Sequence, residues 1–151
     1  MKIMSMGAPN PAAQTVLVVE DEVLVRMAVS QQLRDCGYNV VEAANADEAL
    51  IVLEHHKAAV HIVLSGVEMP GSMDGFALAT WIRKNRPDLR VILAASVSRA
   101  VKAAMELCSS GPLPGKYEPH NLLDRIRRLK ATRAARKFFG RWRQFTTRMR
   151  R

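Results

Sequence analysis

The strongest fold signal in the chain is the stretch TVLVVEDE at residues 15–22. Val16 to Val19 is a continuous apolar and mostly β-branched run, which is typical of a strand buried on both faces of a parallel sheet. The run ends abruptly in Glu20, Asp21 and Glu22. Open α/β sheets carry their ligand chemistry at the carboxyl ends of the strands, so these carboxylates are predicted to lie at the functional edge.

Helix and strand patterns alternate beyond this first strand. A helix is predicted next, with Leu24, Met27, Ala28 and Leu33 on its buried side and Gly37 as a left-handed cap. The remaining patterns predict strands at 39–42, 60–64 and 90–95, a helix capped by Asn45 with Glu48, and helices at 76–85 and 100–107. A weak fifth strand is predicted at 109–115, and a last helix from Pro119 with apolar Leu122, Ile126 and Leu129. This order predicts an α/β fold with a doubly wound, five-stranded parallel sheet.

Charge is distributed unevenly along the 151 residues, a length that fits one domain. The formal net charge is +9, yet residues 125–151 hold 12 Lys or Arg and no acid, which leaves residues 1–124 with a net charge of −3. The same segment contains four of the eight aromatic residues, namely Phe138, Phe139, Trp142 and Phe145. We therefore expect a flexible leader at 1–14, a domain at 15–130 and a basic, aromatic tail at 131–151 that meets a polyanion.

The two cysteines, Cys36 and Cys108, are too few for a disulfide framework, and no Cys/His group has zinc spacing. We expect both to be buried small hydrophobic side chains. His55 and His56 are expected at the surface, near the end of a helix. No stretch has the apolar length of a signal peptide or a membrane-spanning helix, which predicts a cytoplasmic protein.

Two motifs, VLVVEDE at 16–22 and VEMPGSMDG at 67–75, resemble the CheY-like receiver domain of bacterial response regulators, a flavodoxin-like fold, over roughly residues 15–130. The resemblance implies that the acidic pair Glu20 and Asp21 holds Mg²⁺, and that an Asp four residues before Pro70 accepts a phosphoryl group. That acceptor position is Gly66. We therefore expect no phosphoryl transfer and at most weak Mg²⁺ binding, because the third carboxylate is missing.

Two further positions depart from the family pattern. The hydroxyl expected after the fourth strand falls in Ala94-Ala95-Ser96, with Ala at either plausible register, and the family Lys aligns with Gly115-Lys116. Glu68 either substitutes partly for the missing carboxylate or points to solvent. An engineered acceptor-dead substitution at Gly66 is the alternative, and the simultaneous loss of the hydroxyl and the Lys argues against it.

The tail suggests a replacement for phosphorylation. Arginine pairs in a bidentate way with guanine and aromatic rings stack on bases, so a guanine dinucleotide such as cyclic di-GMP fits both features. A receiver without its acceptor, followed by RIRRLKATRAARKFFGRWRQF at 125–145, resembles the Cle proteins, which bind cyclic di-GMP and act on the flagellar motor switch. The predicted ligand-binding residues are Asp124, Arg125, Arg128, Arg133, Arg136, Trp142 and Arg143.

Simpler interpretations remain for the same residues. Asp124 pairs equally well with Arg127 or Arg128 on a solvated helix face, and the tail aromatic rings suit packing on the domain or in a dimer. A basic aromatic helix also suits nucleic acid or an anionic membrane surface. No nucleophile–base pair, metal cluster or phosphate loop is present in the sequence, so we expect no enzyme, no catalytic residue and no cofactor.

Overall fold

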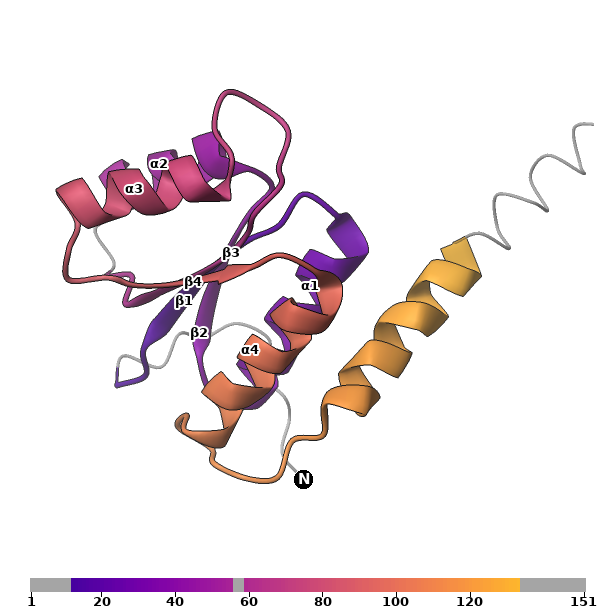
Figure 1. Ribbon diagram of the computed structural model, residues 1–151. Coiled ribbons are helices and arrows are strands. Elements are labelled where there is room, and N and C mark those ends of the chain that lie inside the picture. The colour runs from indigo at the N-terminus through magenta and orange to yellow at the C-terminus, as the bar shows by residue number, and fades with distance from the viewer. Residues whose placement is uncertain (1–11, 56–58, 134–151) are drawn as a thin grey trace, which may run out of the picture.

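The computed structural model describes residues 12–55 and 59–133. Strands and helices alternate along the chain, and Figure 1 shows their arrangement. The strands are β1 (Thr15–Val19), β2 (Asn39–Ala43), β3 (Ile62–Gly66) and β4 (Arg90–Ala94). The helices are α1 (Val23–Asp35), α2 (Ala46–His55), α3 (Gly75–Asn85) and α4 (Val97–Ser109), followed by a C-terminal helix over residues 119–133.

The sheet is parallel, in the order β2-β1-β3-β4, and both of its faces are covered by helices. Successive strand residues point to opposite faces, so Val16 and Val18 join one core cluster while Leu17 and Val19 join the other. Helices α2 and α3 cover one face, and α1, α4 and the C-terminal helix cover the other, as Figure 1 shows. The predicted buried parallel sheet is confirmed.

The predicted fifth strand is wrong. Residues 109–115 complete α4 and then form a loop, and the described sheet has four strands. Pro112 and Pro114 have no amide hydrogen to give to a strand ladder, and the amide of Leu113 donates instead to the Cys36 carbonyl (3.1 Å). α4 packs on the same face of the sheet as α1.

The C-terminal helix is attached to the α1 and α4 layer by its predicted apolar stripe. Leu122 and Ile126 are buried in the core cluster that contains α1 and α4, whereas Leu129 is 39% exposed. Burying two such side chains contributes roughly 1.5–3 kcal/mol each. The boundary expected at residue 130 therefore falls within a continuous helix.

Within the described residues, no helix is long and apolar enough to cross a membrane.

The ends of α1 and α2 follow the sequence signals. Gly37 adopts φ +100°, and the amides of Gly37 and Tyr38 donate to the Arg34 and Leu33 carbonyls (both 3.0 Å), as in a Schellman cap. Before α2, Asn45 accepts from the Glu48 amide (2.8 Å), as predicted.

Two of three expectations about single side chains have outcomes in the structure. Met27 was expected to be buried and is 55% exposed, because Val25, Ala28, Val29 and Leu33 form the inner face of α1. His55 is exposed as predicted, and His56 lies outside the described residues.

Gly37→Ala tests the cap on which the α1–β2 turn depends. A Cβ at this position meets Pro112 Cβ at 2.9 Å and requires a left-handed backbone. We expect the free energy of unfolding to fall by about 1–2 kcal/mol or more, the cost of a side chain in that conformation. Urea denaturation measures it. Gly115→Ala is the matched control, because its Cβ meets nothing closer than 3.5 Å, and equal losses for both variants would contradict the account.

Candidate functional site

The acidic residues after β1 lie at the carboxyl edge of the sheet, as predicted. The amide of Glu20 donates to the Ala43 carbonyl at the end of β2 (3.0 Å), which holds Glu20 at this edge. Its side chain is partly buried, whereas Asp21 is exposed. The Glu20 carboxylate accepts from the Glu22 amide (3.1 Å). The loop that connects β1 to α1 therefore orients one carboxylate inward and leaves the next in solvent.

Gly66, at the end of β3, lies beside this carboxylate on the adjacent strand. A Cβ on Gly66 would lie 3.3 Å from Glu20 Oε2, so an acidic side chain there would point into the same site. Gly66 pairs with Ala94 of β4, which has no hydroxyl. The hydroxyl of Ser96 caps α4 by accepting from the Arg99 amide (3.2 Å). The structure thus brings together Gly66 and Ala94, the positions at which the resemblance expects the acceptor and the hydroxyl.

The second motif builds the wall beside Gly66. The amide of Gly75 donates to the Val67 carbonyl (2.8 Å), and a Cβ on Gly75 would collide with the Gly66 carbonyl oxygen. Asp74 caps α3 by accepting from the Ala77 amide (2.8 Å). Glu68 is exposed. The motif residues therefore have structural roles that do not require phosphorylation.

Burial is the main reason why the pKa of Glu20 is raised above its ordinary value. An apolar crevice lies beside this side chain, lined mainly by Val18, Val25, Leu64 and Ala100. The charge of Asp21 raises the pKa further, and the hydrogen bond from the Glu22 amide opposes both effects.

Among the residues that the structure describes, no cation pairs with the Glu20 carboxylate. Arg26 donates to the backbone carbonyl of Glu20 (2.9 Å), and its Nε lies 3.6 Å from the Glu42 carboxylate. Glu42 also accepts from Arg34, with Nη2 and Oε2 separated by 3.2 Å. The arginine nearest to the site is therefore engaged with β2 and the backbone.

Lys116 does not belong to the site. Its loop is attached to the opposite, amino edge of the sheet, because the Leu113 amide donates to Cys36 just before β2 and the Tyr117 hydroxyl donates to the Leu113 carbonyl (2.6 Å). Lys130 of the C-terminal helix pairs with a carboxylate of the acidic loop, with its Nζ 2.9 Å from Glu22 Oε1. Sequence reasoning missed this pair, since only the docking of the last helix brings residues 22 and 130 together.

The family's Mg²⁺ does not fit the residues present. Hard cations need several oxygen ligands, and the described residues contain no group of three or more His, Cys, Asp or Glu side chains able to hold a metal. Glu20 and Asp21 supply at most two carboxylates, of which one is exposed.

The predicted ligand-binding arginines begin on the C-terminal helix. Arg125, Arg128 and Arg133 are exposed. Asp124 Oδ1 lies 3.5 Å from Arg127 Nη1, an exposed pair of the kind that its simpler interpretation describes. Arg136, Trp142 and Arg143 lie outside the described residues.

Comparison with known proteins gives the same assignment as the fold and the site. The model of the response regulator receiver domain matches residues 16–127. The chain is 39% identical to the response regulator protein FleR of Pseudomonas aeruginosa over 77% of this chain, and 47% identical to the sensor kinase CckA of Brucella abortus over 52% of it. Among solved structures, the Vibrio cholerae chemotaxis protein CheY4 is 27% identical with a TM-score of 0.50, covering 78% of this chain and 98% of that one. The response regulator protein TrrA of Thermotoga maritima aligns similarly, with a TM-score of 0.51 and 27% identity over 77% of this chain and 98% of that one.

This protein belongs to the response regulator receiver domain family of two-component signalling. The chain spans only 24% of FleR and 8% of CckA, so it matches one part of each of those proteins.

Glu20→Gln tests the electrostatics of the site through pH. A carboxyl with a raised folded-state pKa favours the fold most at a pH below its unfolded value, and this contribution is lost as the pH rises through the folded pKa. We therefore expect Glu20→Gln to be more stable than the native chain at pH 7, with the gain disappearing towards pH 4. Thermal unfolding across this pH range measures it, and Asp21→Asn, at the exposed neighbour, should show a smaller gain. A gain that persists unchanged at low pH would contradict burial as the cause.

Gly66→Asp tests the missing third carboxylate. The new side chain points towards Glu20, so we expect Mg²⁺ affinity to rise in calorimetry and stability without metal to fall through like-charge repulsion. The native chain should remain unmodified by acetyl phosphate in mass spectrometry. An acid-labile phosphoryl group on the native chain would show that another residue is the acceptor.

Proposed function

We propose that this receiver domain signals without phosphorylation, by binding cyclic di-GMP through its arginine-rich C-terminal segment and then engaging a protein partner such as the flagellar motor switch. It acts as an adaptor and not as an enzyme. The observation that carries the proposal is the pairing of Gly66 with Ala94 beside an intact acidic loop. Because the receiver fold is retained without its acceptor, its input must come from another chemistry.

The described part of the C-terminal helix supports the ligand class. Leu122 and Ile126 are buried on the inner face of this helix, and the side chains of Arg125, Arg128 and Arg133 are exposed. No acid pairs with any of these three within the described salt bridges. Guanidinium forks recognise phosphate and the O6/N7 edge of guanine, and the sequence beyond residue 133 adds Arg136, Trp142 and Arg143.

A protein partner fits the same helix. Leu129 continues the stripe of Leu122 and Ile126 but is 39% exposed, so one apolar side chain is open to solvent on a helix that also carries exposed cations. Mixed apolar and arginine surfaces are enriched at protein interfaces. Ligand bound to the arginines would neutralise their charge and change which partner this surface accepts.

Calorimetry with cyclic di-GMP, GTP and short duplex DNA at two salt concentrations tests the proposal. We expect tight binding only to the dinucleotide. Trp142→Ala should weaken it by roughly 1–3 kcal/mol through lost stacking, and Arg133→Ala or Arg136→Ala by about 1–3 kcal/mol through lost bidentate contacts. Arg83→Ala on α3 is the matched control, because Arg83 is an exposed arginine on the opposite face of the sheet.

The alternative ligands give different results in the same experiment. Equal losses for all arginine substitutions, with a steep salt dependence and little effect of Trp142→Ala, would identify a general polyanion such as nucleic acid. Binding confined to anionic vesicles would identify a membrane surface. Either result would overturn the cyclic di-GMP proposal.

A further inference from the structure

The two cysteines, expected to be separate buried side chains, are bonded to each other. The Cys36–Cys108 disulfide joins the C-terminal end of α1 to the last turn of α4, across 72 positions of sequence. Both residues are fully buried in the core cluster of the α1 face. The expectation of burial is confirmed and that of two unpaired thiols is wrong, because tertiary packing of α4 on α1 places them together.

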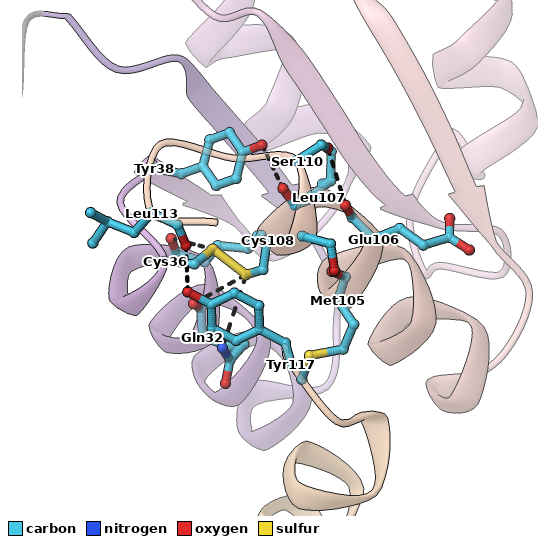
Figure 2. Close-up of a disulfide and its surroundings, with 12 residues drawn as sticks. Gln32, Cys36, Tyr38, Met105, Glu106, Leu107, Cys108, Ser110, Leu113 and Tyr117 are labelled. Atoms are coloured by element: carbon cyan, nitrogen blue, oxygen red, sulfur yellow. Dashed lines mark hydrogen bonds between the residues drawn. A yellow bond between two sulfur atoms is a disulfide. The ribbon is translucent and has the colours of Figure 1, made fainter. Parts of the chain in front are cut away.

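Hydrogen bonds tie the surrounding loop to this bridge (Figure 2). The Tyr38 hydroxyl donates to the Leu107 carbonyl (2.8 Å), and the Leu113 amide donates to the Cys36 carbonyl (3.1 Å). The Tyr117 hydroxyl donates in turn to the Leu113 carbonyl (2.6 Å), and the Tyr117 ring packs against the same core cluster. The bridge therefore lies where the chain leaves α4 and turns towards the C-terminal helix.

We propose that Cys36 and Cys108 form a reversible thiol–disulfide site, and that its oxidation state determines how firmly residues 110–133 are held on the domain. The oxidant is a low-molecular-weight disulfide of the glutathione class. A cysteine thiolate attacks one of its sulfurs and releases one thiol, and the second cysteine then attacks the mixed disulfide and releases the other. Two protein thiols lose two protons and two electrons in total, and the small disulfide is reduced to two thiols.

Two features favour reversible formation of the disulfide: the expected cell compartment and the exposed loop beside the bridge. Disulfides in reducing compartments are mostly transient, and the sequence predicts a cytoplasmic location. Residues 112–116, which follow the bridge, are exposed, and only a few hydrogen bonds hold this loop. Local opening of such a loop is the ordinary route by which buried groups react. While the loop is closed, the Cys36–Cys108 bond is buried and does not react with thiols in solution.

The effect should be confined to one face of the sheet. Leu122 and Ile126 of the C-terminal helix pack in the same cluster as both sulfurs, whereas α2 and α3 pack in the other cluster. When the bridge is reduced, the end of α4 is held only by packing and by hydrogen bonds such as Tyr38 to Leu107. Residues 110–133 then open more often, and the helix that carries Arg125, Arg128 and Lys130 is held less firmly.

Hydrogen exchange on the full chain, read by mass spectrometry in glutathione buffers of different poise, tests this proposal. Thiol counting should show both states interconverting without aggregation. On reduction, amides in residues 110–133 should exchange at least about tenfold faster, since a disulfide closing a long loop usually stabilises by more than that factor. Amides of α3 serve as the internal control and should change much less.

Cys36→Ser and Cys108→Ser should each exchange like the reduced chain at every poise. If a serine variant fails to fold, the comparison of the two native redox states still decides the matter. A bond that does not re-form after reduction would overturn the proposal, as would unchanged exchange in residues 110–133. Equal acceleration of hydrogen exchange in α3 would also overturn the proposal, because the disulfide would then stabilise the whole domain and not residues 110–133 in particular. None of these outcomes depends on cyclic di-GMP.

Discussion

The packing of α4 against α1 on one face of the sheet is the interaction on which the rest of this structure depends. β4 is the last strand of the described sheet, so the chain returns along the layer that already contains α1. This return places the loop after α4 at the amino edge of the sheet, against Cys36. The C-terminal helix then runs back towards the carboxyl edge, where Lys130 meets Glu22 (Figure 1).

This layer explains how the site differs from the family pattern. Lys116, which the resemblance aligns with the family lysine, lies in a loop at the amino edge of the sheet. Lys130 of the C-terminal helix instead faces the acidic loop at the carboxyl edge. The Lys130–Glu22 pair is 43% and 41% exposed on its two side chains, so it is worth at most about 1 kcal/mol. Burial of Leu122 and Ile126 supplies the larger docking energy. The Glu22 amide also donates to the Glu20 carboxylate. The residue that pairs with Lys130 of the C-terminal helix is therefore hydrogen-bonded to the acidic site.

Much of this could be predicted from local patterns. The run at 15–22 predicted the first buried strand and its acidic end, and Gly37 and Asn45 predicted helix caps. The fifth strand could not be excluded, because a short run with two prolines carries no reliable periodicity. The Cys36–Cys108 bond and the Lys130–Glu22 pair depend on where α4 and the last helix dock, which the spacing of residues along the chain does not reveal.

A zero-length carbodiimide cross-link tests the central claim most directly, because it joins an amine to a carboxylate only when the two are in contact. The account predicts an intramolecular amide bond between Lys130 and Glu22, found by mass spectrometry of the monomer and absent from Glu22→Gln. A 1:1 mixture of ¹⁴N- and ¹⁵N-labelled chains distinguishes it from links between molecules. Lys130 linked instead to carboxylates on other elements, or only between molecules, would contradict the docking of the C-terminal helix described above.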